Sequence, residues 1–199
     1  MRILAGKYKG RVLLPPPPKA QTRPITGRAK KSLFDTLGPY LEGAVVLDLY
    51  SGTGTMGIEA LSRGAVRCIF AEKDRRVVAR LRKNIETCGA GGASDIWCGD
   101  IRFSLRPRLA GLDETVDVAF VDPPYADARR WDWAKAEANI FAPLADKLAD
   151  DGLVVLRTPK GLEVPATIAG LTEMRTKKYG GMIITLLGRR DPPGDAETR

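Results

Sequence analysis

The chain has 199 residues, of which 44% are hydrophobic, and its formal net charge is +8. This length suits one well-buried domain, and no apolar run approaches the roughly 18 residues of a membrane span, so we expect a cytoplasmic protein without a membrane partner. The absence of histidine excludes serine–histidine and cysteine–histidine nucleophilic schemes and imidazole acid–base chemistry. The three cysteines lack metal-ligand spacing, so we expect reduced thiols, no disulfide framework and no bound metal.

Residues 1–43 are basic, and we expect them to form an arm that packs on the main domain. Residues 2–6 and 11–14 are typical of two short strands of a hairpin, and the proline run 15–18 predicts an extended spacer. Thr26 is expected to cap a helix over about residues 28–41. Nine basic residues precede the first acidic residue, which favours a polyanionic partner such as nucleic acid over a merely solvated basic face.

From residue 44 onward, short apolar runs alternate with amphipathic stretches, which predicts parallel strands connected by helices. A hairpin around Gly180-Gly181 is expected to add a final antiparallel strand, which gives a mostly parallel, seven-stranded sheet with helices on both faces. We assign residues 44–188 to this α/β domain and residues 189–199 to a flexible tail. The predicted strands are 44–49, 66–71, 94–98, 116–121, 152–157, 174–179 and 182–187, and the predicted helices are 55–63, 73–88, 101–109 and 132–149.

The turn after the first predicted strand contains the pattern Gly52-x-Gly54-x-x-Gly57. With Glu72 about 20 residues later, this pattern is compatible with a nicotinamide or flavin dinucleotide. Asp48 argues against that cofactor, because a carboxylate just before the turn repels a pyrophosphate. The same carboxylate attracts an ammonium or a sulfonium group. S-adenosylmethionine carries both groups and no phosphate, and we therefore favour it.

The predicted cofactor site lies at the carboxyl ends of the first three strands. Asp48 and the glycine turn suit the methionine end, Glu72 suits the ribose hydroxyls, and Asp100 is placed for the adenine amine. Taken singly, Asp100 is also a typical helix N-cap. With Asp122, four successive strands end in a carboxylate, which favours a polar site. The predicted cofactor-binding residues are Asp48, Ser51, Gly52, Thr53, Gly54, Glu72, Lys73, Asp100 and Ile101.

The segment Asp122-Pro123-Pro124-Tyr125 follows the apolar run 116–121. Two consecutive prolines fix φ and cannot continue a ladder, so the chain leaves the sheet stiffly at this point. The Asp122 carboxylate and the Pro123 carbonyl offer two acceptors, and Tyr125 offers a ring. These groups match a flat exocyclic amine, which has two N–H donors. For the bare motif, the alternative is a rigid strand exit with an aromatic plug.

Together these motifs resemble those of the RsmD-type methyltransferases, which make N2-methylguanine in 16S ribosomal RNA of the small subunit. The resemblance implies a Rossmann-like class I fold, S-adenosylmethionine as the cofactor, and Asp122, Pro123, Pro124 and Tyr125 as the catalytic residues. It also implies 16S ribosomal RNA, within a small-subunit particle, as the partner. The matching segments are residues 6–11, 23–26, 33–34, 48–65, 72–75, 84, 122–125 and 178–180.

The arm is the part of the chain that we expect to contact RNA phosphates, chiefly through Lys7, Arg11, Arg23 and Arg28. The chain departs from the family pattern there, with Gly27 in place of the usual Asp, and with Lys30-Lys31-Ser32 where the family usually has Arg-Glu before the Leu-Phe pair. Three other functions stay open: a DNA adenine-N6 methyltransferase, a non-catalytic RNA-binding or ribosome-assembly protein, and a dinucleotide oxidoreductase. The first has no obvious target-recognition domain in this chain.

Overall fold

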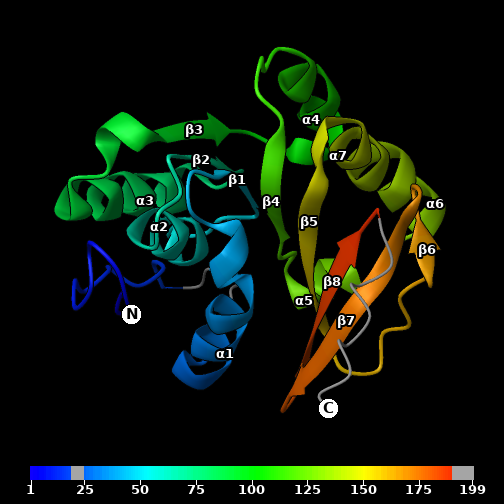
Figure 1. Ribbon diagram of the computed structural model, residues 1–199, viewed down its shortest axis with the longest axis horizontal. Helices are drawn as coiled ribbons and strands as arrows, with labels where there is room; N and C mark the ends of the chain where they lie inside the picture. Colours follow the sequence, from blue (N-terminus) through cyan, green and yellow to red (C-terminus); the bar gives the residue numbers. More distant parts are fainter. Residues whose placement is uncertain (19–24, 190–199) are drawn as a thin grey trace, which may run out of the picture.

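The computed structural model describes residues 1–18 and 25–189, and its centre is one mixed sheet of eight strands (Figure 1). The strands are β1 (Val45–Leu49), β2 (Arg67–Glu72), β3 (Ser94–Cys98), β4 (Val116–Val121), β5 (Leu148–Pro159), β6 (Thr167–Ile168), β7 (Leu171–Tyr179) and β8 (Met182–Gly188). Their order in the sheet is β3-β2-β1-β4-β5-β8-β7-β6. Strands β1 to β5 pair in parallel, and β8 runs antiparallel to its neighbours β5 and β7.

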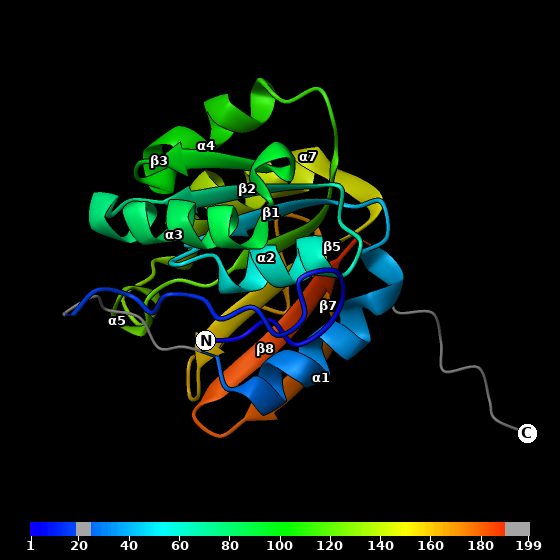
Figure 2. The same cartoon turned by 90° about the vertical axis from the view of Figure 1, so that its left-hand side faces the viewer.

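Helices cover both faces of this sheet (Figure 2). They are α1 (Gly27–Leu37), α2 (Thr55–Ser62), α3 (Arg75–Cys88), α4 (Ile101–Ala110), α5 (Tyr125–Ala128), α6 (Trp133–Ala136) and α7 (Ala142–Lys147). Consecutive strand residues point to opposite faces, so Val46 joins the core under α1, α2 and α3, whereas Leu47 joins the core under α4 and α7. The five parallel strands therefore end at one edge between two helical layers, where ligands of such sheets bind.

The predicted elements of the main domain are confirmed, with three main differences. The short helix α5 after β4 was not predicted. The sheet has eight strands because Thr167–Ile168 pair with the start of β7. The helix predicted for residues 132–149 is interrupted by a π turn over Glu137–Phe141, and residues 148 and 149 already belong to β5. Pro143 lies in the first turn of α7 and has no N–H to donate, which accounts for the break in regular hydrogen bonding.

The predicted N-terminal hairpin is reduced to a single antiparallel bridge between Arg2 and Val12. Ile3 N still donates to Arg11 O over 3.0 Å. The pairing ends after Ile3 because the Glu59 carboxylate of α2 accepts from Leu4 N over 2.8 Å and from Ala5 N over 3.1 Å. Figure 2 shows the arm running along the helical face formed by α2 and α3. The arm is thus bound to the main domain by hydrogen bonds from its backbone N–H groups to the Glu59 carboxylate.

The helix of the arm begins as predicted and ends earlier. Thr26 Oγ1 accepts from Ala29 N over 3.3 Å and caps α1. The helix ends at Leu37, and a 3-10 turn over Gly38–Tyr40 replaces the last predicted turn. Pro39 cannot donate to the α-helical ladder, which explains the early end.

Two further contacts hold the arm against the domain. A Cβ added to Gly6 would lie 1.6 Å from Ser62 O, so only glycine permits this close approach. The Asn84 side chain of α3 accepts from Leu14 N over 2.7 Å and donates to Leu14 O over 3.2 Å. It also donates to Thr53 O over 2.9 Å. One carboxamide therefore joins the arm to the glycine turn.

Candidate active site

A cavity of about 380 Å³ lies at the carboxyl ends of β1, β2 and β4. That volume is within the range of small-molecule and cofactor sites. Every predicted catalytic and cofactor-binding residue except Gly54 lines it. Gly54 instead packs beneath the turn, where an added Cβ would lie 2.4 Å from Leu81 Cδ1. The lining set from the prediction is Asp48, Ser51, Gly52, Thr53, Glu72, Lys73, Asp100, Ile101, Asp122, Pro123, Pro124 and Tyr125.

Asp48 is the most deeply buried carboxylate of this cavity, with 1% of its surface exposed. Its Oδ2 accepts from Gly57 N over 2.9 Å, which ties the end of β1 to the first turn of α2. The pKa of Asp48 is raised to about 7, chiefly by burial and also by the nearby Asp122 and Glu72 carboxylates, while the Gly57 hydrogen bond opposes the change. A cationic ligand would therefore stabilise the ionised form.

The glycine turn is built from left-handed backbone conformations. Tyr50 has φ 60°, Gly52 has φ 56° and Gly54 has φ 84°. A tyrosine in this region is strained, and such strain is concentrated at ligand sites. Ser51 Oγ is buried and has no hydrogen-bond partner among the described residues. The turn thus holds an unsatisfied polar atom at the wall of the cavity, as a site built for a polar ligand does.

Glu72 connects the second strand to the same turn. Its Oε2 accepts from Gly52 N over 3.1 Å and its Oε1 accepts from Asp74 N over 2.8 Å. These two bonds fix the carboxylate at the end of β2, within the cavity lining. Asp74 caps α3 by accepting from Arg76 N, and it lines the cavity beside Glu72.

Asp100 and Lys73 have protein partners at the rim of the cavity. Asp100 caps α4 by accepting from Arg102 N over 3.0 Å, and it forms an ion pair with Arg102 Nη2 at 2.5 Å. Hydrogen bonding to Arg102 lowers the pKa of Asp100. Lys73 Nζ lies 3.7 Å from Asp127 Oδ2. Asp100 thus has the N-cap role considered above as well as a place in the cavity wall.

Asp122 lies beside an arginine that the sequence analysis did not select. Arg157 of β5 donates from Nε to Asp122 Oδ1 over 2.5 Å, and its Cζ lies 5.9 Å from the Tyr125 ring centre. Burial raises the pKa of Asp122, and the charge of Arg157 opposes this effect. The sequence does contain a signal for Arg157, because it is a charged residue inside the apolar run 153–159. A cation in a buried strand usually has an acidic partner.

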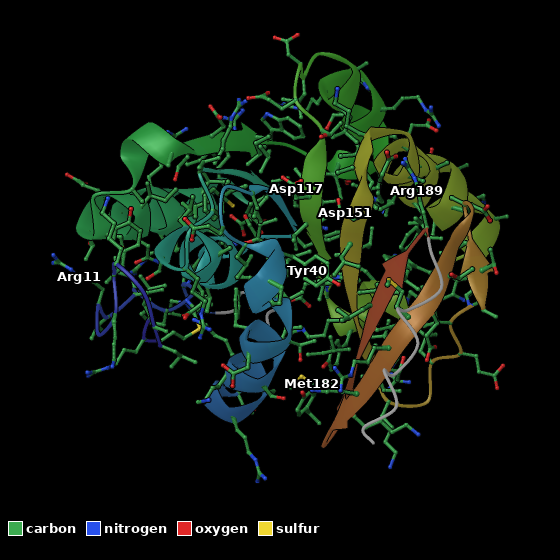
Figure 3. The ribbon with its side chains drawn as sticks, viewed as in Figure 1. Arg11, Tyr40, Asp117, Asp151, Met182 and Arg189 are labelled. Carbon is green, nitrogen blue, oxygen red and sulfur yellow. The ribbon has the colours of Figure 1, made fainter. Side chains whose placement is uncertain are left out.

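The described basic residues of the arm that we expected to contact RNA face solvent and do not line the cavity. Lys7, Arg11 and Arg28 are exposed, and Figure 3 shows Arg11 at the outer edge of the arm. Arg23 lies outside the described residues. Sequence reasoning missed the residues of the arm that do reach the cavity, which are Met1, Pro16 and Ile25. These residues reach the cavity only because the arm packs on the domain, and the sequence around them does not indicate this packing.

Among the described residues, no cluster of three or more cysteine or acidic side chains is arranged to hold a metal ion. None of the helices in residues 1–18 and 25–189 has both the length and the hydropathy needed to cross a bilayer.

Comparison with known proteins places the chain in a family. Residues 1–188 match the family model described as Conserved hypothetical protein 95. The Escherichia coli (strain K12) protein named Ribosomal RNA small subunit methyltransferase D is 31% identical over 199 residues, covering 99% of this chain and 93% of its own. The solved structure titled "Putative methyltransferase yhhF from Escherichia coli" is 31% identical with a TM-score of 0.77, covering 96% of this chain and 98% of that one.

A more distant structure extends the match at the level of the fold. It is a methyltransferase solved in complex with SAH, 14% identical with a TM-score of 0.65, covering 79% of this chain and 48% of that one. The predicted Rossmann-like methyltransferase fold is thereby confirmed. The chain belongs to the family of the small-subunit ribosomal RNA methyltransferase D.

Proposed function

We propose that the protein transfers a methyl group from S-adenosylmethionine to the exocyclic N2 amine of a guanine in 16S ribosomal RNA. One observation carries this proposal: the amine-binding groups Asp122, Pro123 and Tyr125 share a single cavity with Asp48 and the glycine turn. A methyl donor and an amine can therefore meet there. The name of the E. coli relative supports ribosomal RNA of the small subunit as the substrate.

The residues of the cavity fit S-adenosylmethionine. When bound, this cofactor supplies an electrophilic methyl group on a sulfonium. Asp48 would hold the positively charged methionine end, Glu72 would accept from the ribose hydroxyls, and Ser51 Oγ would gain a hydrogen-bond partner. The fold-level neighbour with bound SAH supports the same cofactor. The roles of Lys73, Asp100 and Ile101 at the adenine end stay predictions.

The amine site addresses the main chemical difficulty of the reaction. The lone pair of an aryl amine is delocalised into the ring, so the nitrogen is a weak nucleophile. Asp122 and the Pro123 carbonyl would accept its two N–H bonds and place negative charge where positive charge develops in the transition state. After transfer the nitrogen is cationic and acidic, so a carboxylate or water can take its proton without histidine. Tyr125 would stack on the base, a contact of about 1–3 kcal/mol.

The proposal is tested with Asp122→Ala and with Asp151→Ala as a surface control. We expect Asp122→Ala to lower methyl transfer by about a hundredfold or more, because it removes a charged acceptor from the transition state. S-adenosylmethionine binding by calorimetry should survive, since Asp48 and the turn are unchanged. Retention of full activity in Asp122→Ala would contradict the assigned role.

The substrate is tested separately by product analysis. Mass spectrometry of nucleosides from small-subunit particles treated with the protein and labelled cofactor should show N2-methylguanosine. N6-methyladenosine in DNA would support the adenine methyltransferase, and the absence of any labelled product in RNA or DNA would support a non-catalytic RNA-binding protein.

A further inference from the structure

We propose that Arg157 is a positioning residue for methyl transfer: it binds one oxygen of Asp122 and thereby assigns the other oxygen to the substrate amine. This inference rests on the proposed function. Arg157 orients the Asp122 carboxylate that accepts from the amine, and it keeps this buried carboxylate ionised.

Arg157 and Asp122 are neighbours because their strands are adjacent. Strands β4 and β5 pair in parallel up to Val121 and Leu156, so the following residues of the two strands lie side by side at the sheet edge. Arg157 Nε donates to Asp122 Oδ1 over 2.5 Å, and the two side chains are only 11% and 22% exposed. A charge-assisted bond of this length, largely shielded from solvent, fixes the orientation of the carboxylate.

The charge of Arg157 balances the acidic lining of the cavity. Of the described residues that line it, Lys73 and Arg157 are the ones with positively charged side chains, and Lys73 lies near Asp127. Arg157 acts on both inner carboxylates: its charge lowers the pKa of Asp48 and of Asp122, against the burial that raises both. An arginine stays protonated at every physiological pH, so this counter-charge is permanent.

The same guanidinium also contacts the stacking ring. Its Cζ lies 5.9 Å from the centre of the Tyr125 ring, within the range of a cation–π contact. One side chain on β5 therefore touches both the acceptor and the aromatic group that follows it. The relative placement of these two groups is held by Arg157 as well as by the rigid prolines between them.

The contact through Oδ1 has a chemical consequence for residue 122. Because Arg157 donates to Oδ1, Oδ2 is the oxygen that is assigned to the substrate amine. An asparagine at this position has one oxygen and one NH₂ group. Its oxygen would face the Arg157 donor, and its NH₂ group would face the amine, so that donor meets donor. We therefore expect Asp122→Asn to lower the rate of methyl transfer only while Arg157 donates to the one side-chain oxygen that remains.

A double-mutant cycle tests this assignment with Asp122→Asn, Arg157→Met and the combination. We expect Asp122→Asn to lower kcat and Arg157→Met to restore part of it, with the double variant about tenfold more active than Asp122→Asn. The carboxamide can then turn its oxygen toward the substrate. A double variant no more active than Asp122→Asn would overturn the proposal, since a merely structural arginine gives no such rescue.

A second measurement needs no substrate. We expect carbon-13 NMR titration of the Asp122 carboxyl to show a pKa about one pH unit or more higher in Arg157→Met than in the wild type. Arg157→Lys, which keeps the charge, should restore part of the difference. Arg67→Met is the matched control, because Arg67 pairs with Asp95 and Glu114 on the same sheet and does not line the cavity.

The two measurements separate this inference from the proposed function. An unchanged Asp122 pKa in both Arg157 variants would overturn the role of Arg157 while wild-type guanine methylation stands. A wild-type protein that leaves guanine N2 unmethylated would overturn the proposed function, and the titration would still decide whether Arg157 holds Asp122 ionised. Thermal unfolding of each variant confirms that folded protein is compared, and Arg157→Lys serves if Arg157→Met does not fold.

Discussion

The four carboxylates that end the first four strands have four different partners. Asp48 accepts from Gly57 N, and Glu72 accepts from Gly52 N. Asp100 pairs with Arg102, and Asp122 pairs with Arg157. The pKa of Asp100 is lowered, whereas those of Asp48 and Asp122 are raised by burial. A ligand can therefore change the charge state of Asp48 and of Asp122, which lie at the donor and acceptor ends of the proposed reaction.

Asp48 makes cofactor binding depend on pH. Its pKa of about 7 in the free protein means that the carboxyl is protonated below that pH and ionised above it. If the ionised form binds the cationic cofactor, affinity should rise by about tenfold per pH unit up to pH 7 and level off above it. Calorimetric measurement of the affinity for S-adenosylmethionine from about pH 5.5 to about pH 8.5 tests this dependence. Asp48→Asn should bind weakly with a flatter profile, and a flat wild-type profile would contradict the assignment.

The secondary structure elements of the main domain were predictable because their apolar runs are local signals. Strands such as Val116–Val121 are short and β-branched, and helices such as Arg75–Cys88 have caps and helical spacing. The docking of the arm was not predictable. It depends on Glu59, a helix residue with no local sign of burial, and on Gly6, whose need for glycine appears only when Ser62 lies against it.

The arm also contains a pair of adjacent lysines in opposite environments. Lys30 Nζ lies 2.8 Å from Glu59 Oε2, and the two side chains are 3% and 0% exposed. Lys31 forms an exposed pair with Asp35. Arg63 Nε also lies 2.9 Å from Glu59 Oε1, so Glu59 keeps one cationic partner when Lys30 is removed. Losing the Lys30 partner of this buried carboxylate should lower the free energy of unfolding of Lys30→Ala by about 1–3 kcal/mol.

Lys31→Ala is the control for this prediction and should unfold like the wild type, because exposed pairs contribute little. Urea unfolding of both variants measures the difference. Equal stability of the two variants would show that the arm does not depend on its buried ion pair.

At the scale of the whole molecule, the cavity is assembled from distant parts of the chain. Met1 and Pro16 of the arm, Asp48 and Glu72 of the first two strands, and Arg157 of the fifth strand all line it. The strand-end carboxylates could be found from sequence, since parallel strands bring their carboxyl ends to one edge. Arg157 and the arm residues could not, because their places depend on strand order and on the packing of the arm.

The exposed basic side chains of the arm should govern the salt dependence of RNA binding. Lys7→Ala combined with Arg11→Ala removes two exposed cations. If both contact phosphates, the slope of log affinity against log salt should fall by about 1.4–1.8. Arg106→Ala with Lys135→Ala, on α4 and α6, is the charge-matched control (Figure 1). Binding to 16S ribosomal RNA at several salt concentrations measures the slope, and equal slopes for the two double variants would place the RNA elsewhere.

Asn84 connects the arm to the cavity, so binding at one of these places affects binding at the other. It bonds Leu14 of the arm and Thr53 of the glycine turn with the same side chain, while Pro16 and Ile25 form part of the cavity wall. A ligand in the cavity and a polyanion on the arm therefore act on one connected body. Coupling between two binding sites is reciprocal. If bound cofactor raises the affinity for RNA by some factor, bound RNA therefore raises the affinity for the cofactor by the same factor.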